Sequence, residues 1–279
     1  MDLSPLISTD DLARLLQDDA GVRVIDASWH LDGRDARTDF EAARIPGAVF
    51  FDLDAISDAH SSLPHMLPSP GAFSTAMSAL GVSDKDRIVV YDTQGLFSAP
   101  RAWWMLTTMG ASQVQVLDGG LPKWRAEGRR LEHGPAQALA PSQFAAWPAS
   151  STVATLDDVR QALAAGGQVL DARGAPRFRG EAAEPRPGVR PGHMPGAANL
   201  PYPRLLGADG GMKQGPALEQ AFKDAGIDLS QPVITTCGSG VTAAILTLGL
   251  AMLGRPSRLY DGSWTEWGSR SDAPVVTGP

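Results

Sequence analysis

The stretch of sequence that decides the fold is VITTCGSGVT at residues 233–242, which is followed by the apolar run from Ala243 to Leu253. Its first four residues are apolar or β-branched and predict a short buried strand, whereas the longer apolar run predicts a helix. Gly238 and Gly240 let the backbone between them curl tightly. The stretch therefore predicts a strand, a tight turn and a helix, with the only cysteine of the chain, Cys237, held at the turn.

Cys237 is a candidate nucleophile because of this setting. Successive N–H groups of a tight turn can converge on the sulfur, and the positive end of the following helix dipole points at the same place. Such a site favours the thiolate over the thiol. The alternative is an inert buried thiol, which is what most free cysteines are. The glycine-flanked turn favours the reactive thiol.

The strand and the turn have a counterpart in the first half of the chain, at an offset of about 145 residues. Ile88 to Asp92 matches Val233 to Cys237, and Leu117 to Trp124 matches Tyr260 to Trp267. This offset is much longer than any solenoid period and indicates a duplicated domain. Each half alternates short apolar strands with helices. That pattern predicts an α/β fold of two domains, each a mainly parallel sheet with helices on both faces.

The duplication predicts an N-terminal domain at residues 1–130, a linker at 131–152 that is rich in Ala, Pro, Gly and Ser, and a C-terminal domain at 153–279. Thr9 and Thr155, each followed closely by acidic residues, are the predicted N-caps of the first helix in each domain. Asp92 stands where the second domain has Cys237. Only the C-terminal domain can therefore carry out thiol chemistry, and the first domain is either structural or contributes to a cleft.

Composition narrows the classes of function. With 279 residues, of which 43% are hydrophobic, the chain is long enough for two soluble domains. The net charge of -7 argues against a nucleic-acid or membrane partner. A single cysteine excludes an internal disulfide and a cysteine-based zinc site, so a reducing compartment fits best. The stretch from Met1 to Pro5 shows no targeting pattern, and no segment reaches membrane-spanning length, so we expect a cytoplasmic protein.

These residues resemble the tandem-domain sulfurtransferases of the rhodanese superfamily and, within them, the 3-mercaptopyruvate sulfurtransferases. The turn after Cys237 is similar to the mercaptopyruvate type, whereas the thiosulfate-using rhodaneses carry two basic residues where this chain has Gly238 and Ser239. The resemblance covers nearly the whole chain. It also includes the segments Asp92–Gly95, Ser98–Trp104, Leu117–Gly120, Pro185–Gly188, Pro191–Gly196 and Asp261–Trp264.

The resemblance implies a two-step sulfur transfer. The Cys237 thiolate attacks the sulfur of 3-mercaptopyruvate, becomes a persulfide and releases pyruvate. A thiol acceptor such as thioredoxin, or cyanide in an assay, then removes the outer sulfur. No cofactor is implied, and the histidines lack the clustered spacing of metal ligands.

Two other functions remain open, namely a thiosulfate:cyanide sulfurtransferase (a rhodanese) and a non-catalytic rhodanese-like binding module. A cysteine phosphatase fits less well, because Ala243 stands where that chemistry needs an arginine six residues after the cysteine.

The resemblance assigns Arg177 and Arg186 to the carboxylate and carbonyl of mercaptopyruvate. A planar guanidinium suits a carboxylate because it donates two parallel hydrogen bonds. Both arginines lie in the Gly/Pro-rich segment 174–196, which we expect to be a loop over the site. Solvated surface arginines are the alternative. The remaining substrate-binding residues implied are those of the turn, namely Gly238, Gly240, Val241 and Thr242.

The resemblance also groups Ser239 with His65 and Asp54 as a proton relay, which would protonate the enolate of pyruvate as it leaves. The alternative is that Asp54 and His65 stabilise a domain interface while Ser239 donates a hydrogen bond to the sulfur. Structural roles are expected for Arg173, as a salt-bridge former, and for His193, in a turn. Trp264 and Trp267 fit either a pocket wall or the core.

Overall fold

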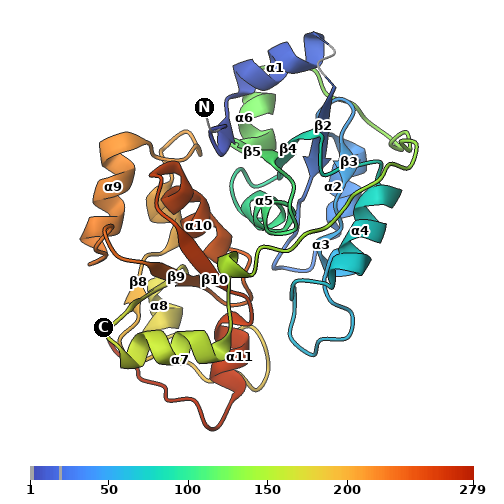
Figure 1. The fold of residues 1–279 in the computed structure, drawn as a ribbon. Helices are drawn as coiled ribbons and strands as arrows, with labels where there is room; N and C mark the ends of the chain where they lie inside the picture. The colour runs from blue at the N-terminus through green and yellow to red at the C-terminus, as the bar shows by residue number, and fades with distance from the viewer. Residues whose placement is uncertain (1–2, 19–20) are drawn as a thin grey trace. The chain divides into compact units, whose positions relative to one another are not determined.

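The computed structural model describes residues 3–18 and 21–279. Met1 and Asp2, part of the N-terminal stretch considered above, lie outside the described residues. The contacts divide the chain into two compact units (Figure 1). The first unit holds the residues up to 59, with 67–149 and 208–212, and the second holds 60–66, 150–207 and 213–279. Segment 60–66 therefore belongs to the second unit and segment 208–212 to the first, although each lies within the other unit's part of the sequence. The predicted domain boundaries at residues 130 and 152 stay a prediction.

The first unit is built on a parallel sheet of five described strands in the order β1-β5-β4-β2-β3. The chain moves from β2 to β3 on one side and from β4 to β5 on the other, so the direction of winding changes between β2 and β4. The strands and helices of this unit are β1 (Leu6–Ile7), α1 (Thr9–Gln17), β2 (Val22–Asp26), α2 (Ala36–Ala42), β3 (Val49–Phe50), α3 (Leu53–Ile56), α4 (Pro70–Ala79), β4 (Arg87–Tyr91), α5 (Ala99–Thr108), β5 (Gln113–Leu117) and α6 (Gly120–Ala126).

The second unit repeats this topology, with the described strands in the order β6-β10-β9-β7-β8 and all pairs parallel. The duplication predicted from the sequence is therefore present in the fold. Its elements are η1 (Ser150–Thr152), β6 (Val153–Ala154), α7 (Leu156–Ala164), β7 (Gln168–Asp171), α8 (Ala175–Phe178), β8 (Ala198–Asn199), η2 (Tyr202–Leu205), α9 (Gly215–Asp224), β9 (Val233–Thr236), α10 (Ala243–Met252), β10 (Ser257–Tyr260) and α11 (Ser263–Ser269).

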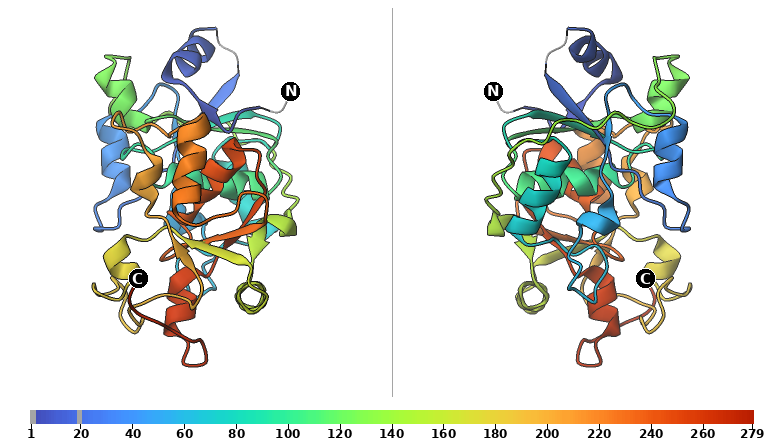
Figure 2. Two further views of the ribbon diagram at one scale, coloured as in Figure 1. Left: turned by 90° about the vertical axis from the view of Figure 1, so that its left-hand side faces the viewer. Right: turned by 90° about the vertical axis from the view of Figure 1, so that its right-hand side faces the viewer.

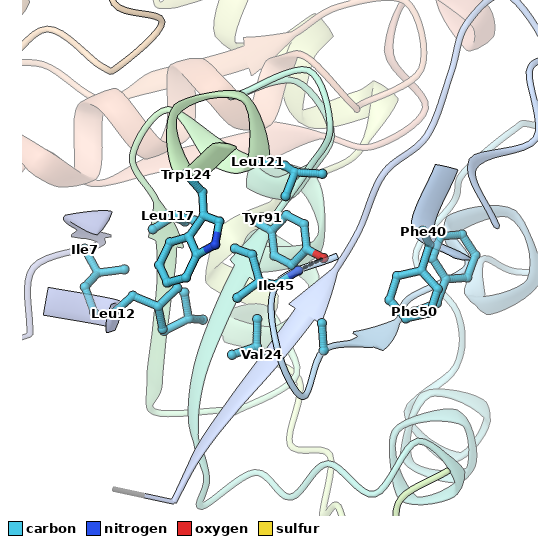
Figure 3. Close-up of a cluster of buried hydrophobic side chains, with 12 residues drawn as sticks. Ile7, Leu12, Val24, Phe40, Ile45, Phe50, Tyr91, Leu117, Leu121 and Trp124 are labelled. Atoms are coloured by element: carbon cyan, nitrogen blue, oxygen red, sulfur yellow. Dashed lines mark hydrogen bonds between the residues drawn. The ribbon is translucent and has the colours of Figure 1, made fainter. Parts of the chain in front are cut away.

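Helices cover both faces of each sheet, as predicted (Figures 1 and 2). In the first unit Val24 and Val89, paired across β2 and β4, belong to a buried cluster with Leu12 of α1 and Trp124 of α6 (Figure 3). The same cluster holds Tyr91, whose hydroxyl accepts the N–H of Ile45 at 3.2 Å. Helix α5 packs on β4 and β5 without joining this cluster. In the second unit α10 packs on β9 and β10, and it is buried along most of its length.

The first helices of the two units are capped in different ways. Thr155 caps α7 as predicted, and its side chain exchanges hydrogen bonds with Asp158 in a capping box. Thr9 was the wrong prediction for α1, because the cap is Ser8. Ser8 has extended backbone angles and its Oγ accepts the N–H of Asp11 at 3.0 Å, so Thr9 is already the first helical residue.

The segment predicted as a linker is held on the first unit along much of its length. The N–H of Ser142 donates to the carbonyl of Ser78 at 3.0 Å, and Phe144 meets Phe73 edge to face with ring centres 5.4 Å apart. The N–H of Trp147 donates to the carbonyl of Met109. Residues 142–147 are thus part of a packed unit. None of the helices within the described ranges is long and apolar enough to cross a membrane.

We expect the stability of the first unit to depend on pH, because the carboxyl of Asp26 at the end of β2 is buried. Burial raises the pKa of this carboxyl from 3.8 to about 6. The folded chain then holds the proton more tightly than the unfolded chain does. The stabilising contribution of Asp26 is complete below about pH 4 and is lost as the pH rises through about 6, by about 3 kcal/mol.

We expect Asp26→Asn, which removes the buried charge, to flatten this dependence. Urea unfolding at pH 4, 6 and 8 measures it. The variant should gain stability relative to wild type as the pH rises, and parallel pH profiles for the two proteins would contradict the assignment.

Candidate active site

The cysteine turn lies where the sequence predicts it. Strand β9 ends at Thr236 and α10 begins at Ala243, so residues 237–242 form the connection at the carboxyl end of a central strand. Cys237 is buried, with 2% of its surface exposed. Gly240 has a φ of +79°, a left-handed conformation that disfavours a side chain. The sequence folds into this tight turn because a glycine stands at that position.

The turn is fixed through its carbonyl groups. The carbonyl of Cys237 accepts the N–H of Trp264 at 2.9 Å, and the carbonyl of Gly238 accepts both the N–H and the hydroxyl of Thr265. The N–H of Cys237 donates to Oγ of Ser263 at 3.3 Å. Among the described residues no acceptor is recorded for the N–H groups of 238–242. A row of unused donors at the start of a helix is suited to a negative charge on sulfur.

Asp92 shows in the same chain what such a turn does with an anion. Its carboxylate follows β4 directly, as Cys237 follows β9. Its Oδ1 accepts the N–H of Gln94 at 2.8 Å, and Oδ2 accepts those of Phe97, Ser98 and Ala99 at 2.8–3.0 Å. The turn in the first unit is therefore filled by its own side chain. The equivalent turn in the second unit offers its donors to the sulfur of Cys237 or to a group bound to it.

Arg177 lies against the cysteine turn. A Cβ atom at position 238 would be 3.1 Å from Nη2 of Arg177, so the guanidinium occupies the space that a side chain would need there. Arg177 lies on the short helix α8, and the prediction of a loop was wrong at this point. The reason is that Pro176 suits the first turn of a helix, even inside a segment rich in glycine and proline.

A buried network of charges holds this arginine. Glu184, with a side chain 3% exposed, accepts from Nη2 of Arg177 at 2.5 Å and from Nη1 of Arg173 at 2.8 Å. Arg173 in turn pairs with Asp171 at 2.7 Å and lies over the ring of Trp264. The structural role predicted for Arg173 is confirmed. The Asp171–Arg173–Glu184 network fixes the guanidinium of Arg177 beside Gly238.

Arg186 lies in the irregular segment between α8 and β8, as predicted, and is half-buried. Its role toward the substrate stays a prediction. His193, in the same segment, stacks on Phe178 with ring centres 3.8 Å apart, and its Nδ1 donates to the carbonyl of Phe178 at 2.9 Å. His193 thus stabilises this segment, which is a structural role.

Ser239 is joined to a histidine from a distant part of the sequence. Its Oγ lies 3.0 Å from Nδ1 of His65, and both side chains are buried. His65 belongs to segment 60–66 of the second unit and has a φ of +61°, which is rare for a residue with a side chain. Asp54 belongs to the first unit, where its Oδ2 accepts from Nε1 of Trp29 at 3.1 Å. A link from Asp54 to His65 stays a prediction.

Three residues beside the site had no role in the sequence analysis, namely Glu184, Ser263 and Thr265. Ser263 has a φ of +50°, and its Oγ accepts a hydrogen bond from the N–H of Cys237. The hydroxyl of Thr265 donates to the carbonyl of Gly238. The Asp-Gly pair that recurs at 118–119 and 261–262 was a signal for Ser263, which follows the second pair. Trp264 and Trp267, which the sequence left undecided, are buried in the core cluster. Across the part of the chain that is described, no group of three His, Cys, Asp or Glu side chains could hold a metal ion.

Two comparable units of parallel sheet, one with a cysteine cradled between a central strand and a helix, define the class of protein. The model of the rhodanese-like domain matches the chain twice, at residues 8–127 and 155–270. The chain therefore belongs to the rhodanese family, in the group that contains the 3-mercaptopyruvate and the thiosulfate sulfurtransferases.

Individual relatives within this group are similar to the chain over most of its length. It is 45% identical over 263 residues to 3-mercaptopyruvate sulfurtransferase of Escherichia coli K12, covering 92% of this chain and 93% of that protein. It is 40% identical to the mitochondrial thiosulfate/3-mercaptopyruvate sulfurtransferase 1 of Arabidopsis thaliana, covering 97% and 78%. The crystal structure of the E. coli enzyme SseA superposes with a TM-score of 0.85 at 41% identity, covering 94% of this chain and 99% of that one.

Proposed function

We propose that this sulfurtransferase takes its sulfur from 3-mercaptopyruvate and carries it as a persulfide on Cys237. The observation that carries the proposal is the turn after Cys237, where the N–H groups of residues 238–242 have no acceptor among the described residues and the guanidinium of Arg177 lies beside Gly238. A donor with one carboxylate at a distance from its sulfur fits this arrangement.

The first half-reaction follows from these groups. The Cys237 thiolate attacks the sulfur of mercaptopyruvate, an S–S bond forms and the C–S bond breaks, and the electron pair goes to the carbon of the pyruvate enolate. The proton of the donor thiol ends on that carbon, so that the products are a persulfide anion and pyruvate. Ser239, 3.0 Å from His65, is the group proposed to pass this proton, with Asp54 behind His65. Arg177 and Arg186 hold the carboxylate and the carbonyl.

The second half-reaction returns the enzyme to its thiolate. A thiol acceptor, for which thioredoxin or a small dithiol is proposed, attacks the outer sulfur of the persulfide. With cyanide as acceptor the product is thiocyanate, and the Cys237 thiolate leaves. Gly238, Gly240, Val241 and Thr242 form the turn that stabilises the charge in both steps. Thiosulfate is the second candidate donor, because the Arabidopsis relative is named for both donors.

Thiocyanate formation from each donor tests the proposal. We expect a higher kcat/KM for mercaptopyruvate than for thiosulfate, because thiosulfate is a dianion and needs more positive charge at the rim of the turn than Gly238 and Ser239 supply. Wild type preferring thiosulfate, or forming no thiocyanate, would overturn it.

The same assay on a double variant, Gly238→Arg with Ser239→Lys, tests whether the turn sets this preference. Use of thiosulfate should rise, and the gain should shrink at high salt because exposed charges are screened over about 10 Å at 0.1 M. Use of mercaptopyruvate should fall, since the Ser239 hydroxyl proposed to pass the proton is lost and a side chain at 238 comes within 3.1 Å of Nη2 of Arg177. Ser239→Ala is the control that separates loss of the hydroxyl from gain of charge. An unchanged donor ratio would show that these side chains do not decide specificity.

A further inference from the structure

The first unit contains a hollow of about 600 Å³ that the sulfur transfer does not use. It is lined from the segments that follow three strands: His30 and Arg34 follow β2, Thr93 and Gln94 follow β4, and Arg125 lies on α6 after β5. All these segments leave the carboxyl ends of parallel strands. The winding of the sheet changes direction between β2 and β4, and this is the place where open α/β sheets bind their ligands.

The charges around the hollow leave one cation uncompensated. Asp39 is 2.8 Å from Nε2 of His30 and 3.8 Å from Nη1 of Arg34, and Arg34 also pairs with Asp32 at 2.9 Å. Arg125 is exposed, and no ion pair or hydrogen bond of its side chain is recorded within residues 3–18 and 21–279. The hollow therefore offers a single free guanidinium to a ligand.

The other polar groups that line the hollow are held in place. Both groups near Nδ1 of His30 are donors, Nη2 of Arg34 at 3.4 Å and Nε2 of Gln94 at 3.2 Å, so Nδ1 accepts and Nε2 donates to Asp39. Nε2 of Gln94 also donates to the carbonyl of Trp29 at 3.1 Å, which leaves its amide oxygen as an acceptor. The hydroxyl of Thr93 is buried and has no hydrogen-bond partner among the described residues. Rotation of this side chain would bring the hydroxyl into the hollow, where a bound molecule can satisfy it.

The rest of the lining is apolar and comes from Ala42, Leu121, Pro122 and Ala126. We propose that this hollow binds a small monocarboxylate with a short apolar body. The carboxylate pairs with Arg125, the body lies on the apolar residues, and a polar group at the other end reaches Gln94 or Thr93. A dianion is disfavoured because the hollow has only one uncompensated charge and contains Asp39. Asp92 takes no part, because its carboxylate is already bound by four N–H groups.

Binding of 4-methyl-2-oxopentanoate, measured by calorimetry on the full chain, tests the proposal. The background is Arg177→Ala with Arg186→Ala, which disables the carboxylate contacts proposed for the active site. We expect this background to bind the probe, and Arg125→Ala to weaken binding about tenfold or more, since a charge-assisted hydrogen bond is lost. Ala126→Asp, which adds a negative charge to the lining, should weaken it as well. Inorganic phosphate should bind less tightly than the probe.

Arg255→Ala is the matched control, because Arg255 is exposed, lies in the second unit and lines no part of the hollow. It should bind the probe as the background does. Equal binding by the Arg125→Ala and Arg255→Ala proteins, or no binding by the background at millimolar probe, would overturn the proposal. These outcomes are independent of the sulfur-transfer assay, so the proposed function can stand or fall separately.

Discussion

Cys237→Ser is expected to abolish sulfur transfer while leaving the fold intact. A hydroxyl nearly matches the thiol in size, but it is a far poorer nucleophile toward sulfur and cannot carry a persulfide. The hydrogen bonds to Ser263 and Trp264 are kept, because both are made by backbone atoms of Cys237. The measurement is the mass of the intact protein after treatment with mercaptopyruvate, together with thiocyanate formation.

Wild type should gain one sulfur and the serine variant none. The melting temperature of the variant provides the control for folding. An added sulfur on the variant would show that Cys237 is not the nucleophile. A wild type without an added sulfur would contradict the proposed persulfide intermediate.

Arg177→Ala and Arg186→Ala are each expected to lower kcat/KM for mercaptopyruvate by roughly 10- to 150-fold, because a charge-assisted hydrogen bond contributes about 1.5–3 kcal/mol. Stability should change little in Arg177→Ala, because Glu184 keeps its ion pair with Arg173. Steady-state kinetics with mercaptopyruvate measure kcat/KM, and thermal unfolding measures the stability of each variant.

Arg179→Ala provides the matched control for these variants. Arg179 follows α8 directly and pairs with the exposed Glu181 at 2.8 Å, so it carries the same charge without a recorded contact to the turn. Its kinetics should equal those of wild type. If all three variants behaved alike, the assigned pose of the substrate would be wrong.

The local pattern of the sequence predicted the parts of the site that are close together in the chain. The strand at 233–236 and the start of the helix at Ala243 follow from residue type, because β-branched residues favour a strand and the glycines after it allow a tight turn before the apolar run. The repeated strand order follows from the duplication. Residue-by-residue resemblance brought Ser239 together with His65, and their side chains are 3.0 Å apart.

Contacts between segments that are far apart in the chain could not be predicted from the local sequence pattern. Nothing in the residues around Glu184 indicates that it joins Arg173 to Arg177, since a glutamate in a proline-rich segment is ordinarily solvated. The start of α1 was misplaced by one residue because Ser8 and Thr9 are both good caps, and only their backbone angles distinguish them. The helix at Arg177 was missed because a four-residue helix has too few positions to show a period.

The assignment of segment 60–66 to the second unit and of segment 208–212 to the first affects the order in which contacts can form during synthesis. Met212 donates its N–H to Asp118 at 2.7 Å, so the first unit lacks this bond until the ribosome has passed residue 212. His65 is synthesised early, yet its partner Ser239 emerges far later. During translation segment 60–66 is therefore complete long before Ser239 is available to it, and their hydrogen bond can form only after residue 239 has been added.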